Sequence, residues 1–198
     1  MTELPQRLEH LFKPVDAWGE FRKGARPAAV VFVLYRQGEQ WMVPFVRRRG
    51  DLRDHPGQVA LPGGGVQAGE SAWQAAEREV AEEIGVAVGT LRPSGAGEPI
   101  YAAVSNFSVV PFVAYLPDPA PSFVHDAREL EGVLAIPLDR LLDDSAWRQS
   151  DDQWRFRYLA HEESVVWGLT ERIVFGLAPR LRQGLAEGQS PDLLAAGG

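Results

Sequence analysis

Two apolar stretches, residues 28–35 and 40–47, are rich in Val, Phe and Trp and flank the pair Gln37-Gly38. Stretches of this length on either side of a turn signal are typical of a β-hairpin. Similar stretches predict further strands over residues 100–104, 107–116, 131–136 and 154–159. Helices are expected near residues 4–12, over 71–84 and over 170–182. This pattern by itself indicates a generic α+β domain.

The segment 71–84 shows the clearest helical pattern of the chain. Trp73, Ala76, Val80 and Ile84 recur at spacings of three and four, which places them in one apolar stripe. Ser71 followed by Gln74 fits a capping box, and Gly85 is a natural stop. The pattern predicts an amphipathic helix with one face in the core.

Three carboxylates lie on one flank of this predicted helix, because Glu79, Glu82 and Glu83 are separated by three and four positions. Like charges this close repel one another, and a divalent cation would reverse that penalty. All-oxygen ligands favour hard ions such as Mg²⁺ or Mn²⁺. The alternative is a solvated acidic face, but the run Pro-Gly-Gly-Gly at 62–65 argues for a ligand, since glycine lets backbone approach one closely.

The whole segment from Gly64 to Val86 resembles the Nudix box, the signature of hydrolases that split nucleoside diphosphates linked to another group. Gly64 is followed after five residues by Glu70, and after seven more by Arg-Glu-Val-Ala-Glu-Glu-Ile-Gly-Val. The resemblance implies the Nudix fold, an α/β/α sandwich with a mixed β-sheet, and a Mg²⁺ or Mn²⁺ cofactor. Cations that bridge pyrophosphate oxygens would neutralise charge and lower the pKa of a bound water.

The same resemblance implies roles for individual residues of the box. The expected metal ligands are Glu79, Glu82, Glu83 and the Gly64 carbonyl, with Glu79 or Glu83 nearest the attacking water. The expected catalytic set is Glu79, Glu83, Arg78 and Glu70. Arg78 would orient Glu79 or brace a neighbouring carboxylate through a bidentate pair.

A second motif lies just upstream, where Arg48, Arg53 and Gly57 precede a Pro-Gly-Gly run. It is similar to the segment that marks coenzyme A pyrophosphatases among Nudix proteins. Guanidinium groups suit phosphate oxygens, and coenzyme A carries a 3′-phosphate besides its pyrophosphate. The resemblance therefore implies a substrate-binding set of Arg48, Arg53, Gly57 and Gly63.

The chain departs from this second motif at two positions. Arg49 stands where the family usually has a small hydroxyl residue, and Leu61 stands where it has phenylalanine. An alternative interpretation of Arg47, Arg48 and Arg49 is that these charges blunt the end of an edge strand. The departure at Arg49 bears on which substrate is preferred rather than on hydrolysis.

Length and composition limit the number of domains and the kinds of chemistry that the chain can support. The chain has 198 residues, 45% of them hydrophobic, which suffices for one domain. We expect an N-terminal helix and lead-in over residues 1–25, a Nudix domain over 26–183 and a flexible tail over 184–198. The absence of cysteine excludes disulfides, thiol catalysis and cysteine-ligated zinc, and suits a reducing compartment.

The expected partner is a small molecule. A net charge of −7 argues against nucleic acid. The N-terminus has no apolar signal-peptide region, and the longest apolar run is far too short to cross a membrane. We therefore expect a cytoplasmic protein without a nucleic-acid or membrane partner, as a monomer or homodimer.

Three functions are compatible with these motifs. The first is a metal-dependent pyrophosphatase that converts coenzyme A or its thioesters into 3′,5′-adenosine diphosphate and 4′-phosphopantetheine or its acyl derivative. The second is a broader hydrolase for NADH, FAD, ADP-ribose or damaged nucleoside triphosphates. The third is a ligand-sensing Nudix module without activity; such modules commonly lose carboxylates of the box, and this chain has all of them.

Overall fold

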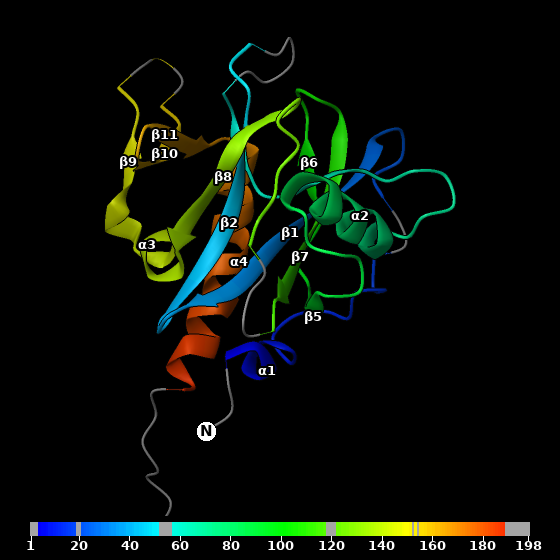
Figure 1. Cartoon of the computed structure of the whole chain (residues 1–198), viewed down its shortest axis with the longest axis horizontal. Helices are drawn as coiled ribbons and strands as arrows, with labels where there is room; N and C mark the ends of the chain where they lie inside the picture. Colours follow the sequence, from blue (N-terminus) through cyan, green and yellow to red (C-terminus); the bar gives the residue numbers. More distant parts are fainter. Residues whose placement is uncertain are drawn as a thin grey trace, which may run out of the picture.

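The structure is a computed structural model, and it describes residues 4–18, 21–51, 57–117, 122–151, 153 and 155–188. Runs of strands separate the helices along the described chain (Figure 1). The helical elements are α1 (Leu4–Leu8), α2 (Ala72–Ile84), α3 (Leu138–Leu142), the 3₁₀ helix η1 (Asp144–Ala146) and α4 (Leu169–Ala186). The strands are β1 (Arg26–Gln37), β2 (Gln40–Arg48), β3 (Val59–Ala60), β4 (Gly63–Gly65), β5 (Arg92–Ala96), β6 (Ile100–Ala102), β7 (Phe107–Tyr115), β8 (Leu130–Pro137), β9 (Trp147–Gln149), β10 (Arg157–His161) and β11 (Ser164–Trp167).

One mixed sheet forms the centre of the molecule. Its main path runs β3-β2-β1-β7-β5, while β4 pairs with β1, β6 with β7 and β8 with β2. The long strands β1 and β7 are parallel, and the other pairs are antiparallel. A separate small sheet has the order β11-β10-β9. The parallel pair explains why β1 is a continuous apolar run, since a central strand is buried on both faces.

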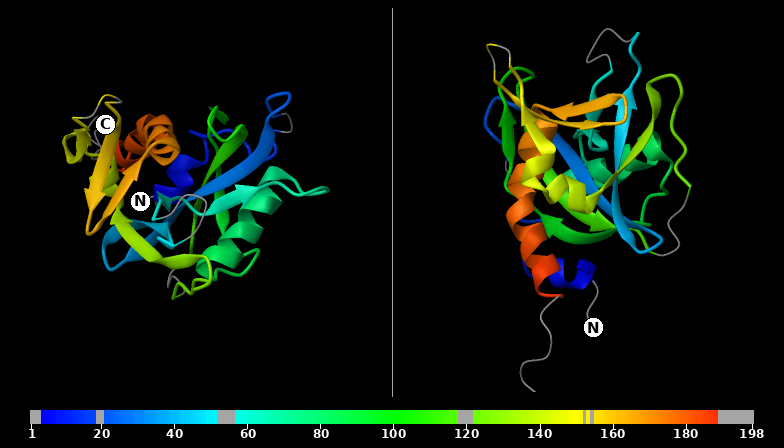
Figure 2. Two further views of the ribbon diagram at one scale, coloured as in Figure 1. Left: turned by 90° about the horizontal axis from the view of Figure 1, so that it is seen from above. Right: turned by 90° about the vertical axis from the view of Figure 1, so that its left-hand side faces the viewer.

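The two faces of the sheet bury different clusters of side chains. Along β1, Val31 and Val33 pack with the apolar stripe of α2, whereas Phe32 and Leu34 point to the opposite cluster with residues of α1, α3 and α4. Figure 2 shows α2 on one side of the sheet and α4 on the other. The expectation of an α/β/α sandwich is therefore confirmed.

The predicted hairpin and the strands predicted over residues 107–116 and 131–136 are confirmed. β1 and β2 pair antiparallel from Tyr35 with Met42 to Gln37 with Gln40. β7 and β8 lie within about one residue of the predicted stretches. The last predicted strand, 154–159, is shifted: β10 spans Arg157–His161, and Trp154 lies outside the described residues.

Several predicted ends of helices and strands are wrong. The first helix ends at Leu8 rather than at residue 12, and Lys13 then pairs with Ala96 beside β5. The strand predicted over 100–104 ends at Ala102, because a turn with Asn106 in the left-handed region (φ 54°) follows. These short segments follow tertiary contacts more than their own apolar pattern.

The C-terminal helix also continues past its predicted end, and residues 184–186 belong to α4 rather than to a tail. Gly184 is buried, and a side chain there would lie 2.6 Å from the Leu8 side chain of α1. The missing side chain lets α1 approach, so the lead-in packs on the domain. Residues 189–198 lie outside the described part. Within the described residues, no helix is long and apolar enough to cross a membrane.

Candidate metal and phosphate site

The helix α2 starts and ends as its sequence predicts. The Ser71 side chain accepts a hydrogen bond from the Gln74 N–H at 3.1 Å, and the Gln74 side chain accepts one from the Ser71 N–H at 2.8 Å. At the other end Gly85 adopts the left-handed conformation with φ 74°. This double cap satisfies backbone groups at both ends and sets the rotation of the acidic flank.

The glycine run brings β4 directly against the acidic flank of α2. At Gly63 the backbone has φ 152°, and a side chain would collide with the Ala29 carbonyl of β1. At Gly64 a side chain would collide with the carboxylate of Glu79. Glycine at position 63 is therefore a steric requirement, because the collision is with backbone, whereas a side chain at position 64 would displace the flexible end of Glu79.

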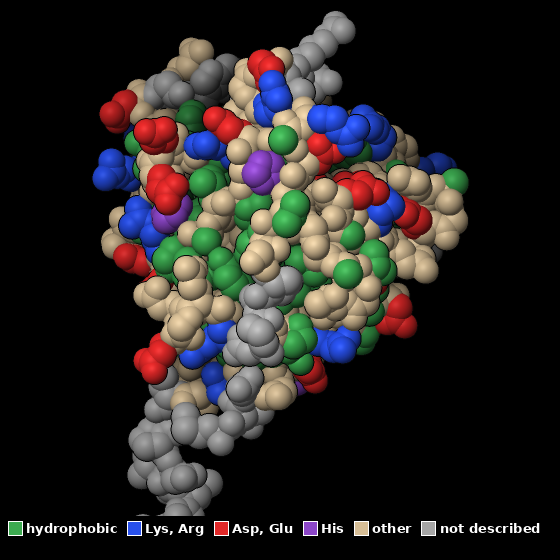
Figure 3. All heavy atoms as spheres, viewed as in Figure 1, with side chains coloured by type: hydrophobic (Ala, Val, Ile, Leu, Met, Phe, Trp, Pro, Cys, Tyr) green, Lys and Arg blue, Asp and Glu red, His purple; other side chains and the backbone are tan. Residues whose placement is uncertain are grey.

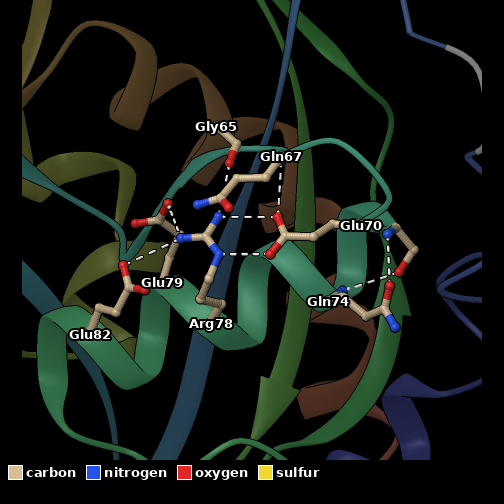
Figure 4. Close-up of polar contacts among 8 residues, drawn as sticks. Gly65, Gln67, Glu70, Gln74, Arg78, Glu79 and Glu82 are labelled. Carbon is tan, nitrogen blue, oxygen red and sulfur yellow. Dashed lines mark hydrogen bonds and ion pairs between the residues drawn. The ribbon is translucent and has the colours of Figure 1, made fainter.

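Arg78 joins four groups around this loop (Figure 4). Its guanidinium forms a bidentate pair with Glu70, with distances of 2.7 Å from Nε and 3.2 Å from Nη2. Nη1 donates to Glu79 at 2.8 Å and to Glu82 at 3.3 Å, and Nη2 donates to the Gly65 carbonyl at 3.0 Å. The bidentate bond goes to Glu70, so Arg78 braces that carboxylate and orients Glu79 with a single bond.

Glu70 is held in its charged form. Its carboxylate accepts hydrogen bonds from Arg78 and from the Gln67 N–H, the latter at 2.9 Å. These bonds, with Arg78 first, hold the pKa of Glu70 below its ordinary value. Glu70 is therefore better suited to be an electrostatic partner of Arg78 than a proton acceptor near neutral pH.

Glu83 and Glu79 behave in the opposite way. Burial raises the pKa of Glu83 to about 7, against the hydrogen bond that it accepts from the Gly63 N–H at 2.9 Å. The charges of Glu79 and Glu129 raise this pKa further, and Arg48 lowers it. Burial also raises the pKa of Glu79, although Arg78 opposes this. A second positive charge beside these two carboxylates would offset the free-energy cost of holding both of them ionised in a partly buried place.

The donor set suits a hard divalent cation. The oxygen donors predicted from the sequence are Glu79, Glu82, Glu83 and the backbone of Gly64, which lies against Glu79. Among the described residues, no three acidic or histidine side chains lie close enough together to hold a metal as they stand. Glu79 and Glu82 accept hydrogen bonds from Arg78, and Glu83 accepts one from the Gly63 N–H. In the space-filling view, acidic and basic side chains lie together over α2 (Figure 3).

Part of the second motif, including Arg48, lies near the acidic site. Arg48 ends β2, and its N–H donates to the Gln58 carbonyl at 3.0 Å. Its Nε is buried without a hydrogen-bond partner in the described structure. Gly57 has φ 67°, and its N–H donates to the Arg49 carbonyl at 3.3 Å. Arg53 lies outside the described residues, so its predicted position beside Arg48 stays a prediction.

The basic run does not blunt an edge strand. Arg47 pairs with Val59 of β3 on one side and with Gly132 of β8 on the other, so β2 is an interior strand at this point. Arg49 is engaged locally: it forms a bidentate pair with Asp51, at 2.8 and 2.6 Å, and donates to the Ala127 carbonyl at 3.0 Å. The extra guanidinium at this position is therefore already paired.

Two features of this region are missing from the predicted site. Glu129 lies near enough to Glu83 to raise its pKa, although it precedes β8 and is far from α2 in sequence. Trp167 is 43% exposed at the end of β11. It lines a cavity of about 690 Å³ that also contacts Gly57 and Gly63. Their nearness depends on how distant strands pack, and no local pattern reports it.

Comparison with known proteins agrees with this geometry. The family model described as the NUDIX domain matches residues 24–158. The chain is 32% identical over 163 residues to "Uncharacterized Nudix hydrolase NudL" of Enterobacter sp. (strain 638), which covers 77% of this chain and 81% of that protein. A protein of the same name from Yersinia enterocolitica is 30% identical over 169 residues, with 82% and 85% covered.

Solved structures share the fold at lower identity. A binary complex of the Caenorhabditis elegans Ap4A hydrolase has a TM-score of 0.52 and 18% identity, over 81% of this chain and 96% of that one. The NUDIX domain of Shewanella oneidensis NrtR in complex with ADP ribose has a TM-score of 0.54 and 17% identity, over 83% and 90%. The extent of the family match, together with the NudL relatives, shows that the chain belongs to the Nudix hydrolase family.

Proposed function

We propose that this Nudix hydrolase cleaves the pyrophosphate bond of coenzyme A or its thioesters with Mg²⁺ or Mn²⁺. The products are 3′,5′-adenosine diphosphate and 4′-phosphopantetheine, or its acyl derivative. The metal ligands in this proposal are Glu79, Glu82, Glu83 and the Gly64 carbonyl, and a bound cation supplies charge neutralisation and an activated water. The box carboxylates are all retained, which favours an enzyme over a ligand-sensing module.

The single observation that carries the coenzyme A assignment is the position of Arg48. Arg48 is half-buried, its Nε has no hydrogen-bond partner among the described residues, and its charge acts on Glu83. A half-buried guanidinium near the glycine loop suits an additional anionic group of the substrate. Arg49 is paired with Asp51, so it does not replace Arg48 in that role.

The proposed chemistry assigns a separate task to each remaining residue. Glu79 or Glu83 accepts a proton from the attacking water, and the raised pKa of both groups brings them closer to neutral pH. Arg78 keeps Glu70 and Glu79 in place. Gly57 and Gly63 complete the proposed substrate-binding set, with Arg53 as a second guanidinium from the coenzyme A motif.

A substrate panel tests the proposal. Coenzyme A, 3′-dephospho-coenzyme A, NADH, FAD and ADP-ribose are incubated with the protein and Mg²⁺ or Mn²⁺, and products are identified by mass. We expect kcat/KM for coenzyme A to exceed that for the dephosphorylated compound by roughly 10–150-fold, the value of a charge-assisted phosphate contact. Arg48→Ala should remove most of this preference. Equal rates for both compounds, or a preference for NADH or ADP-ribose, would leave the broader nucleoside-diphosphate hydrolase as the function.

A further inference from the structure

A cavity of about 690 Å³ opens beside the glycine loop, on the side of the sheet away from α2. Its walls come from four parts of the chain: the segment 57–63, the middle of β1, the β6–β7 connection at 102–107, and the junction of β11 with α4 at 167–173. None of these parts belongs to the acidic flank of the helix. The volume is in the range of sites that hold one small organic molecule.

The lining of this cavity is mainly aliphatic and aromatic. It includes the side chains of Val30, Ala60, Leu61, Phe107, Trp167 and Leu169. Trp167 is 43% exposed, and Val104 at the rim is fully exposed. The one ionisable side chain among the described lining residues is Arg172, which donates to the Tyr101 carbonyl at 3.2 Å. Large apolar side chains left open to water at a concave surface mark a place where a ligand is bound.

Gly63 connects this cavity to the acidic site. The residue lines the cavity, while its N–H donates to Glu83 at 2.9 Å. Gly57 of the coenzyme A motif lines the cavity as well. A substrate whose pyrophosphate lies at the glycine loop therefore has one of its two ends beside this opening.

We propose that this cavity binds the apolar arm of the substrate, and that S-acylated pantetheine compounds are preferred over substrates with a second nucleotide. The inference rests on the proposed function and adds which end of the substrate is read and how. A second ribose and base would present many hydroxyl and ring-edge groups, each needing a polar partner to offset its desolvation. Gln58 and Ser105 are side chains in the lining that can bond the amides of a pantetheine arm, and the apolar remainder suits an acyl chain.

The test compares kcat/KM for coenzyme A, acetyl-, hexanoyl- and octanoyl-coenzyme A with the wild-type protein. Each methylene that the cavity buries should raise kcat/KM by about fourfold until the cavity is full. Binding of octanoyl-coenzyme A and coenzyme A is also measured by calorimetry in excess chelator, where hydrolysis does not contribute. The acylated compound should bind at least about tenfold more tightly, by the same burial.

Two variants alter the cavity in different ways. Trp167→Ala removes the exposed aromatic wall, and Ala103→Trp fills the opening from the exposed β6–β7 connection. Each should lower the ratio of octanoyl- to unacylated-coenzyme A, in kcat/KM and in affinity, by about tenfold or more. Val165→Ala is the matched control, because Val165 is 41% exposed on the same strand but does not line the cavity. It should leave both ratios unchanged.

The outcomes separate the two proposals. If coenzyme A and all its thioesters are cleaved with equal kcat/KM, and Ala103→Trp leaves the ratios unchanged, the cavity assignment is wrong while the proposed function stands. If NADH or ADP-ribose is cleaved and no coenzyme A compound is cleaved or bound, the proposed function is wrong and the cavity assignment falls with it. A chain-length preference that both cavity variants lose, and the control keeps, supports the inference even if Trp167→Ala proves less stable.

Discussion

At the scale of single residues, the proposed chemistry depends most on the carboxylates of Glu79 and Glu83. Both are partly buried beside the glycine loop, and both have a raised pKa. Glu79→Gln and Glu83→Gln keep the shape of the side chain but remove a charge, so each should lower kcat by at least roughly 10²–10³-fold. Steady-state kinetics with matched metal concentrations measures this. Glu77→Gln is the control on the same helix, because Glu77 bonds the Gly89 N–H instead; near-wild-type rates in both site variants would contradict the proposed ligands.

The raised pKa of Glu83 also predicts how stability depends on pH. Its value of about 7 exceeds the ordinary 4.5, so the folded state favours the protonated form. The stability contributed by this group is present below its unfolded pKa and is lost as pH rises through about 7. Glu83→Gln mimics the protonated form, so in chelator its advantage in melting temperature over wild type should grow between about pH 5.5 and pH 8. Thermal denaturation of both proteins across this range checks the sign, and a constant difference would contradict it.

At the scale of elements, the contact between β4 and α2 decides whether the site can form. A side chain at Gly64 would collide with the Glu79 carboxylate, whereas one at Gly65 would come no nearer than 4.0 Å to the Pro27 carbonyl. Gly64→Ala should therefore displace Glu79 and lower kcat by about 10²-fold, the cost of a small misplacement of a catalytic group. Gly65→Ala is the matched control and should retain activity. Rates are compared after circular dichroism has shown that both variants fold, and equal rates would mean that Glu79 does not act from its present position.

At the scale of the whole molecule, folding brings together carboxylates that a bound cation would stabilise. We expect hydrolysis to need added Mg²⁺ or Mn²⁺ and to stop in excess chelator. The cation should also raise the free energy of unfolding, by about 2.7 kcal/mol at about 100 times its Kd. Thermal denaturation with and without metal measures this, and the Glu79→Gln, Glu83→Gln double variant should lose the stabilisation. Full turnover in chelator, with trace metal assayed and absent, would overturn the metal-dependent chemistry.

Much of the fold is already determined by the order of residues. The apolar run of β1, the stripe on α2 and the cap at Ser71 are local patterns, and each predicts its element because hydrophobic periodicity and capping act over a few residues. The short elements β3, β4, β5 and β9 have too few residues for such a pattern, and they exist because neighbouring strands offer them backbone partners.

For the candidate site, the sequence by itself determined which groups are present: Glu79, Glu82 and Glu83 at their spacing, the glycine loop and the arginine motif. Only the tertiary structure decided that Arg78 forms a bidentate pair with Glu70. It also decided that Arg49 pairs with Asp51, and that the charge of Glu129 raises the pKa of Glu83. It alone placed Trp167 at a cavity beside Gly63. The physical reason is that burial, charge interaction and cavity shape depend on distances between segments far apart in the chain, and a local pattern carries no information about those distances.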